Sequence, residues 1–148
     1  MGQADFCPMG GNIMMQAVIM AGGKGTRLAV LTKDEIPKPM VPVAGKPLLL
    51  WQVERLKENG ITVIGHLGDK IKEYFGDGEK FGVSIRYFEE TEPLGTAGSF
   101  YYLKDMIHGD RFVMMSGDLF FDIDFQRMIR FHEEKGAVAT LFVHPNGH

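Results

Sequence analysis

The sequence predicts an α/β protein built on an open, mostly parallel sheet with helices on both faces. Short apolar segments alternate with segments whose apolar residues recur at helical spacing, as in strands joined by crossover helices. With 148 residues, 45% of them hydrophobic, the chain suits one domain that buries roughly two thirds of its extended-chain surface. Residues 1–15 lack periodicity, so we expect a disordered tail and one folded unit over residues 16–148.

Five short segments carry the continuous apolar or alternating pattern of β-strands. In chain order they are Gln16–Met20, 61–64, 83–88, 111–115 and 137–143. The last segment is apolar on both faces, so we expect other elements of the fold to pack on both of them. An uncovered strand of this kind invites pairing with another chain, so we expect self-association there, giving a homo-oligomer or aggregate.

Helical spacing fills the intervals between these strands, and short polar signals mark where helices begin and end. Pro47 suits the first turn of a helix that stops at Asn59 and Gly60. A short helix follows over 69–75, and Thr96 and Asp124 are candidate N-caps of two more. Between the first strand and the first helix, three prolines in residues 33–46 exclude regular helix and predict an ordered loop.

A glycine-rich segment, residues 22–27, follows the first strand directly. Its three glycines allow close approach of the main chain to a ligand, and successive N–H groups form a concave anion site. Lys24 and Arg27 add full positive charges. Leu28 stands where a dinucleotide fingerprint needs glycine, and no glycine precedes a Lys-Ser or Lys-Thr pair. The glycines alone also fit a plain turn, but with the cations they favour a phosphate-binding loop of a third kind.

Two further polar turns, residues 92–98 and 117–118, come after predicted strands, at the sheet edge where ligands bind in open parallel sheets. Lys38 lies between two prolines that restrict its backbone, so its charge is positioned at little entropic cost. Together these segments offer cations, amides and one carboxylate. The set suits a polyphosphate chelated to Mg²⁺, with Asp118 as a hard oxygen ligand. Asp122 and Asp124 fit turn and cap roles better than metal binding.

Composition excludes several other classes of function. The net charge is −3 with acids and bases interspersed, which is not the footprint of a nucleic-acid-binding protein. Cys7 is the only cysteine, so an internal disulfide and a cysteine-based zinc site are excluded and a reducing cytoplasm fits best. No apolar run approaches the roughly 18 residues of a membrane helix, so no membrane partner is expected.

Four segments, in this order and spacing, resemble the sugar-phosphate nucleotidyltransferase family. They are GGKGTRL (22–28), PKPMVPVAGKP (37–47), PLGTAG (93–98) and SGD (116–118). The resemblance extends over residues 17–143 and implies a Rossmann-like, GT-A-like fold. The closing FVHPN (142–146) is further similar to the mannose-1-phosphate and heptose-1-phosphate guanylyltransferase branch.

The resemblance implies that an oxygen of a sugar 1-phosphate attacks the α-phosphorus of a nucleoside triphosphate, GTP in that branch, releasing pyrophosphate. It implies that Arg27 and Lys38 act on the phosphates and that Asp118 binds Mg²⁺. It also implies nucleotide-binding roles for Ala21, Gly22, Gly23, Lys24, Gly25, Thr26, Glu90, Gly95 and Thr96. Glu90 alone does not decide the base, and the sequence leaves the sugar open.

The chain departs from the family pattern in two places. Family members continue well beyond His148 through a second half that completes the sugar pocket, so the chain resembles a C-terminally truncated member and we expect it to fall short of full catalysis. The strand at 61–64 is shorter than the family pattern between Gly60 and His66, which predicts a weakened central strand. A non-catalytic nucleotide-binding or nucleotide-sugar-binding module, or a regulatory fragment, is the alternative. A redox Rossmann domain fits poorly without the third fingerprint glycine.

Overall fold

The computed structural model of the chain describes residues 15–21, 36–66, 68–88 and 95–143. Four parallel strands form its main sheet in the order β5-β4-β1-β6. The strands are β1 (Gln16–Met20), β4 (Thr62–His66), β5 (Ile85–Phe88) and β6 (Phe112–Ser116). Because parallel strands need long crossover connections, each step along the sheet leaves room for a helix.

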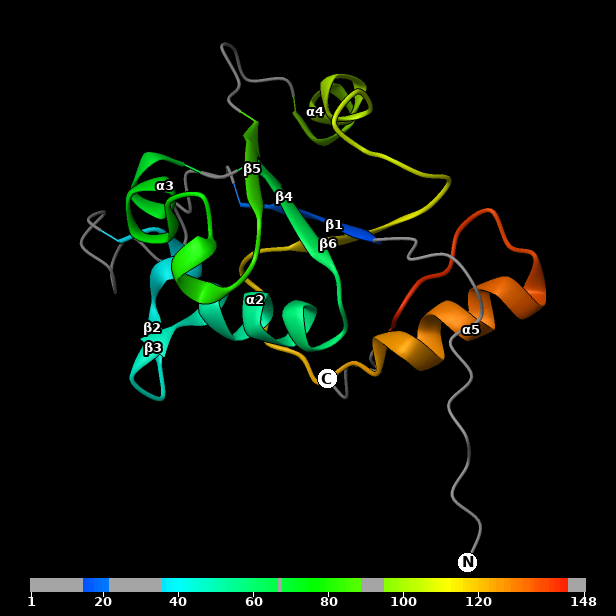
Figure 1. Cartoon of the computed structure of the whole chain (residues 1–148), viewed down its shortest axis with the longest axis horizontal. Helices are drawn as coiled ribbons and strands as arrows, with labels where there is room; N and C mark the ends of the chain where they lie inside the picture. Colours follow the sequence, from blue (N-terminus) through cyan, green and yellow to red (C-terminus); the bar gives the residue numbers. More distant parts are fainter. Residues whose placement is uncertain (1–14, 22–35, 67, 89–94, 144–148) are drawn as a thin grey trace, which may run out of the picture.

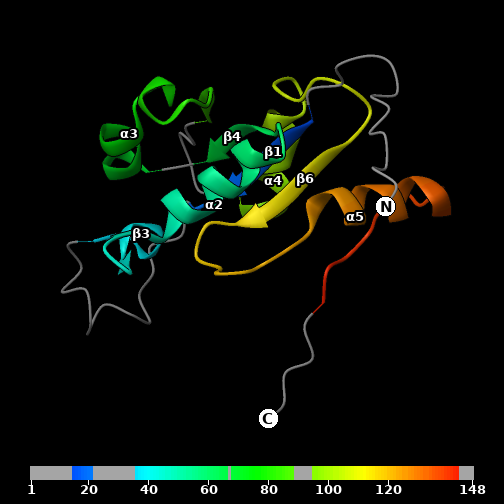
Figure 2. The ribbon, with the colours of Figure 1, turned by 60° about the horizontal axis from the view of Figure 1, so that its bottom comes forward.

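Helices fill most of these connections (Figures 1 and 2). The α-helices are α2 (Leu48–Glu58), α3 (Asp69–Phe75), α4 (Gly95–Leu103) and α5 (Phe125–Lys135). Two 3₁₀ turns, η2 (Lys38–Met40) and η3 (Glu79–Phe81), and a small antiparallel pair, β2 (Pro42–Val43) and β3 (Lys46–Pro47), complete the described elements. Asp124 caps α5 by accepting a hydrogen bond from the backbone N–H of Arg127 at 2.9 Å, as its position in the sequence predicted.

Alternating side chains of β1 divide the core into two layers, one on each face of the sheet. Ala17 and Ile19 pack in the larger cluster with apolar side chains of α2, α3 and α5. Val18 points to the other face, where it packs with Ile64 and with Leu103 of α4. Figure 1 accordingly shows α4 on one side of the sheet and α2 and α5 on the other. The predicted α/β architecture with helices on both faces is therefore confirmed.

The strand register brings the carboxyl ends of three strands to one level. Met20, the last residue of β1, lies opposite His66 of β4 on one side and Ser116 of β6 on the other. Whatever follows these strands therefore leaves the sheet at the same edge. This alignment places Ala21, which follows β1, beside the turn after β6.

The central strand β4 corrects the strand bounds predicted at 61–64, whereas a weakening relative to the family pattern stays a prediction. The strand runs over Thr62–His66 and pairs with β1 on one side and β5 on the other. Glycine has a low strand propensity, so the sequence pattern stopped before Gly65. In the sheet Gly65 lies opposite both Ile19 and Tyr87, and pairing on both sides overrides that local preference.

The remaining boundaries differ from the prediction in small ways. The strands expected at 83–88 and 111–115 occupy Ile85–Phe88 and Phe112–Ser116, while Gln16–Met20 and the helix at 69–75 are confirmed as predicted. Thr96 was expected to cap α4, but α4 begins at Gly95, so Thr96 lies inside its first turn. Helix ends are the part of a sequence pattern that local propensity determines least.

The segment 137–143, predicted to be a strand, forms no strand in the structure. Val138 is fully exposed, and Leu141 and Val143 are 83% and 78% exposed. A strand requires a neighbour for its backbone hydrogen bonds, and the described sheet ends at β6 without pairing to this segment. Its apolar side chains consequently face solvent.

The proline-rich stretch is ordered over its described part, residues 36–46, as predicted. Pro37 precedes η2 as its N-cap and Pro39 lies within it. The carbonyl of Val41 accepts a hydrogen bond from the N–H of Leu48 at 3.0 Å, which ties the segment to the start of α2. Between β2 and β3, Ala44 and Gly45 both have positive φ, 48° and 86°, as a two-residue hairpin turn requires. This hairpin and η2 lie next to α2. In the described part of the chain, no helix is long and apolar enough to cross a membrane.

Gly117 allows the turn after β6 to pack tightly against the end of β1. Its N–H donates to the carbonyl of Met20 at 3.0 Å. A Cβ at this position would lie 2.8 Å from the Cβ of Ala21, 3.3 Å from Ile19 Cγ2 and 3.4 Å from Pro39 Cγ. Only a residue without a side chain therefore fits where β1, β6 and η2 meet.

We predict that Gly117→Ala destabilises the fold by about 1–3 kcal/mol, because the added methyl group would overpack against Ala21 Cβ, which is attached directly to the main chain and cannot easily move. Gly68→Ala is the matched control: a Cβ there meets nothing within 4 Å, and alanine as a poorer N-cap of α3 costs at most about 1 kcal/mol. Urea unfolding followed by circular dichroism measures both variants. Equal stability of Gly117→Ala and wild type would contradict this packing.

Candidate functional site

The carboxyl edge of the sheet brings a cation and a carboxylate together. Lys38 Nζ lies 3.7 Å from Asp118 Oδ2, and the two side chains are 27% and 39% exposed. Lys38 begins η2, whereas Asp118 lies 80 positions later in the turn after β6. The fold, rather than local sequence, creates this pair.

The backbone at both residues is held by short-range contacts. Met40 N–H donates to the carbonyl of Pro37 at 2.8 Å, and Val41 N–H donates to that of Lys38 at 3.1 Å, which closes η2. Ser116 Oγ donates to Asp118 Oδ1 at 2.5 Å, so one carboxylate oxygen is oriented by the strand end while the other faces Lys38. Both charged groups are thus positioned before any ligand arrives.

The ion pair contributes little to stability. A partly exposed pair of this kind typically contributes about 0–1 kcal/mol because water and salt screen it. Its chemical consequence is larger, since it places one positive and one negative group side by side at the edge where open parallel sheets bind ligands. A phosphate oxygen can pair with Lys38, and a metal ion with Asp118.

Of the residues predicted for the site, the structure brings Ala21, Lys38 and Asp118 to one place. Ala21 and Pro39 both approach Gly117, the residue before Asp118. Gly95 and Thr96 open α4. The other predicted residues, Gly22, Gly23, Lys24, Gly25, Thr26, Arg27 and Glu90, lie outside the described residues. The functional roles of all the predicted site residues, Ala21, Lys38 and Asp118 included, stay predictions.

The sequence analysis did not single out two side chains that shape this turn. Ser116 orients Asp118 through a hydrogen bond from its hydroxyl group. A serine two residues before an aspartate is the sequence feature that could have predicted this contact. Gln52, 3% exposed on α2, donates through Nε2 to the carbonyls of Ser116 and Leu119. The sequence feature that could have pointed to Gln52 is its position on the apolar face of the helix. It lies three residues after Leu49 and four before Leu56, both of which are buried.

The donor set fits part of a site for a hard divalent cation. Within the described residues no group of three or more His, Cys, Asp or Glu side chains comes together. Mg²⁺ does not need one, because it commonly binds one or two carboxylates and completes its shell with water and substrate phosphates. Asp118, half-exposed and flanked by the Ser116 hydroxyl, offers that type of oxygen.

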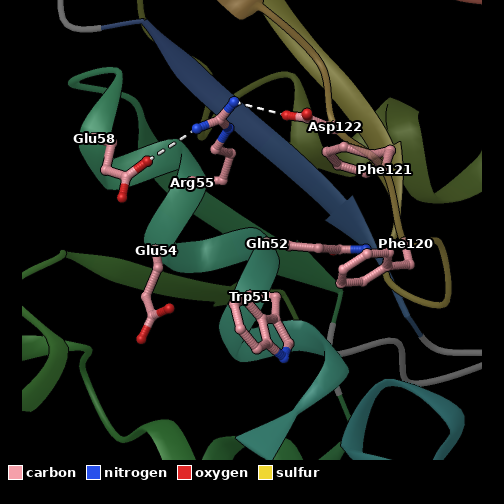
Figure 3. A pocket seen from close by; sticks show the side chains of 8 residues that line it. All are labelled: Trp51, Gln52, Glu54, Arg55, Glu58, Phe120, Phe121 and Asp122. Atoms are coloured by element: carbon pink, nitrogen blue, oxygen red, sulfur yellow. Dashed lines mark hydrogen bonds and ion pairs between the residues drawn. The ribbon is translucent and has the colours of Figure 1, made fainter. Parts of the chain in front are cut away.

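Nearby carboxylates are engaged elsewhere. Asp124 caps α5, as predicted. The prediction of a turn role for Asp122 is wrong, because this residue lies outside any turn. Asp122 pairs with Arg55 at 2.7 Å, and Arg55 also contacts Glu58 at 3.3 Å, along the hollow of about 360 Å³ between α2 and the segment after β6 (Figure 3). Of the three carboxylates at positions 118, 122 and 124, the one that pairs with Lys38 is that of Asp118.

Comparison with known proteins places these observations in a family. The family model described as "Nucleotidyl transferase" matches residues 16–148. The D-glycero-alpha-D-manno-heptose 1-phosphate guanylyltransferase of Campylobacter jejuni is 42% identical over 129 residues, which are 84% of this chain and 57% of that protein. The UTP–glucose-1-phosphate uridylyltransferase of Synechocystis is 38% identical over 142 residues, 86% of this chain and 36% of that protein.

A solved structure is similar to this chain in fold as well as in sequence. HddC from Yersinia pseudotuberculosis, crystallised with GMP-PN, superposes with a TM-score of 0.71 at 33% identity, covering 80% of this chain and 54% of that one. The chain thus spans between about a third and somewhat over half of the length of the proteins it matches. With the family model matched from the first strand onward and the parallel sheet shared with these structures, the chain belongs to the nucleotidyl transferase family.

Proposed function

We propose that this chain is the nucleotide-binding part, residues 16–148, of a sugar-1-phosphate nucleotidyltransferase. The reaction transfers a nucleoside monophosphate from a nucleoside triphosphate to a sugar 1-phosphate: a bond forms between a sugar-phosphate oxygen and the α-phosphorus, and the bond to pyrophosphate breaks. The observation that carries the proposal is the meeting of Lys38 and Asp118 at 3.7 Å beside Ala21. Family membership supports the reaction class.

Within this proposal the charged residues divide the work. Lys38 pairs with an oxygen of the α-phosphate, and Arg27, which follows β1 in the sequence, holds the β and γ groups together with Lys24 and the N–H groups of residues 22–26. Phosphoryl-type transfer depends mainly on positioning and charge neutralisation, which cations and backbone amides supply. Gly95, Thr96 and Glu90 are proposed to contact the nucleoside.

A divalent cation, Mg²⁺ in our proposal, would be held by Asp118. When bound it neutralises charge on the phosphate oxygens. Lys38 pairs with the same carboxylate in the absence of ligand. In the ligand complex, phosphate oxygens would take the place of this carboxylate as partners of Lys38, and Asp118 would hold the cation.

GTP is the proposed donor. The C. jejuni relative is named as a guanylyltransferase, and HddC was crystallised with GMP-PN. The Synechocystis relative is named as a uridylyltransferase, so UTP is the comparison substrate that tests this choice.

Titration of the chain with GTP and Mg²⁺ in a calorimeter tests the nucleotide site. We predict saturable binding that Arg27→Ala weakens about ten- to a hundredfold, because a charge-assisted hydrogen bond contributes about 1.5–3 kcal/mol. The matched control is Arg130→Ala, which removes the same charge from the exposed face of α5 and leaves binding unchanged. Absence of binding, or equal affinity of wild type and Arg27→Ala, would refute the proposed site.

Pyrophosphate release from GTP plus a sugar 1-phosphate separates an enzyme from a binding module. Turnover supports catalysis by this chain. Saturable binding without turnover favours instead a nucleotide-binding module, consistent with a chain that spans 36% to 57% of the length of the relatives compared.

A second copy of the chain is the proposed partner of residues 137–143, whose apolar side chains are exposed. Light scattering should show a mean mass that rises with protein concentration. The double variant Leu141→Lys and Val143→Lys should lower that mass, because charge opposes apolar contact and strand-edge pairing. Ile36→Lys, at another exposed apolar residue, is the control. A constant monomer mass over a wide concentration range would exclude this association.

A further inference from the structure

Gln52 connects the middle of α2 to the turn that carries Asp118. Its side chain is buried, with 3% exposure, although a glutamine on the core face of a helix is costly unless its amide is hydrogen-bonded. Nε2 donates to the carbonyl oxygen of Ser116 at 3.1 Å and to that of Leu119 at 2.5 Å. One amide nitrogen thus holds both ends of the four-residue turn 116–119.

The turn has few other anchors on this side. Leu119 and Phe120 are 51% and 66% exposed, so their side chains contribute little packing that would fix the chain after Asp118. Phe120 makes an edge contact with Trp51 at 6.2 Å between ring centroids. Figure 3 shows Gln52 reaching from α2 toward the segment that bears Phe120. On the other side, Gly117 N–H donates to Met20.

The amide nitrogen, and not the amide oxygen, links Gln52 to the turn. Oε1 is buried and has no hydrogen-bond donor among the described residues. An apolar side chain of similar length would fill the same space but would leave the carbonyls of Ser116 and Leu119 without this donor. The amide nitrogen is therefore the part of Gln52 that holds the turn.

We propose that Gln52 is a positioning residue for Asp118. By holding the carbonyls on both sides of Asp118, it fixes the carboxylate near Lys38, in the orientation that Ser116 completes from within the turn. Gln52 touches neither nucleotide nor metal in this assignment. The inference rests on the proposed function, because the role of Asp118 in holding a metal–triphosphate complex is part of that function.

The variant Gln52→Met tests the assignment, since methionine matches the length of glutamine without its donors. We expect the affinity for Mn²⁺·GTP, measured by the relaxation of water protons, to fall about five- to twentyfold. The matched control is Gln126→Met, which removes an exposed amide that donates to the carbonyl of Asn59 at 3.5 Å, and it should leave the affinity within twofold of wild type.

A double-mutant cycle with Asp118→Ala separates positioning from a general structural effect. In the Asp118→Ala background, Gln52→Met should change the affinity by less than twofold, because the group it positions is gone. A similar loss in both backgrounds, or no loss in the wild-type background, would overturn the proposal.

If Gln52→Met does not fold, Gln52→Glu gives a second test. A protonated glutamic acid can donate one hydrogen bond to a carbonyl, whereas the carboxylate cannot donate and repels the oxygen. The affinity of Gln52→Glu relative to wild type should therefore recover as the pH falls, while Gln126→Glu should show no such recovery. A pH-independent ratio for Gln52→Glu would contradict the assignment.

A readout without ligand distinguishes failure of this inference from failure of the proposed function. If wild type does not bind Mn²⁺·GTP, the proposed function fails. Hydrogen exchange at the Gly117 N–H then still tests whether Gln52 holds the turn 116–119. That exchange should accelerate about tenfold or more in the folded Gln52 variant, Met or Glu, and stay unchanged in the matching Gln126 variant. Unchanged exchange at Gly117 would show that Gln52 does not hold the turn.

Discussion

The parallel pairing of β1 with both β4 and β6 is the constraint on which the site depends. Its register sets Met20 opposite His66 and Ser116, so these three strands end together at one edge of the sheet. The core reinforces the arrangement: Ile19 packs toward α2 on one face and Val18 toward α4 on the other. A shift of β1 by one residue would exchange these faces, which the buried side chains oppose. The apolar packing of the strands therefore fixes where the polar groups meet.

Close approach of backbones then turns this alignment into a site. Gly117 admits Ala21 and Pro39 at distances that a side chain would prevent, and this brings η2 beside the turn after β6. Lys38 and Asp118 face each other as a result, at a partly exposed position where their attraction contributes little to folding. Two groups that are only weakly bound to each other are well placed to exchange that partner for a phosphate oxygen and a cation.

The sequence predicted the parts of the structure that depend on local pattern. The alternation of strands and helices, the boundaries of β1 and α3, the ordered proline segment and the Asp124 cap followed from periodicity and side-chain chemistry. Pairing decided the rest: Gly65 joins β4 because it has neighbours on both sides, whereas residues 137–143 remain outside the sheet despite their apolar composition. In the site, the charges of Lys38 and Asp118 and their positions after predicted strands or between prolines allowed both residues to be predicted, whereas Gln52 was not predicted. Its importance comes from carbonyls 64 and 67 positions away in the chain.

Paramagnetic broadening by Mn²⁺ in the presence of GTP tests most directly whether the site lies at the carboxyl edge of the sheet. The effect falls with the sixth power of distance, and a strand of this length separates the two edges by about 13 Å. The account predicts the strongest loss of amide signal at Ala21, Lys38 and Asp118, and the weakest at Gln16 and Phe112, which pair at the opposite ends of β1 and β6. Broadening centred on Gln16 and Phe112, or spread evenly along the strands, would contradict it.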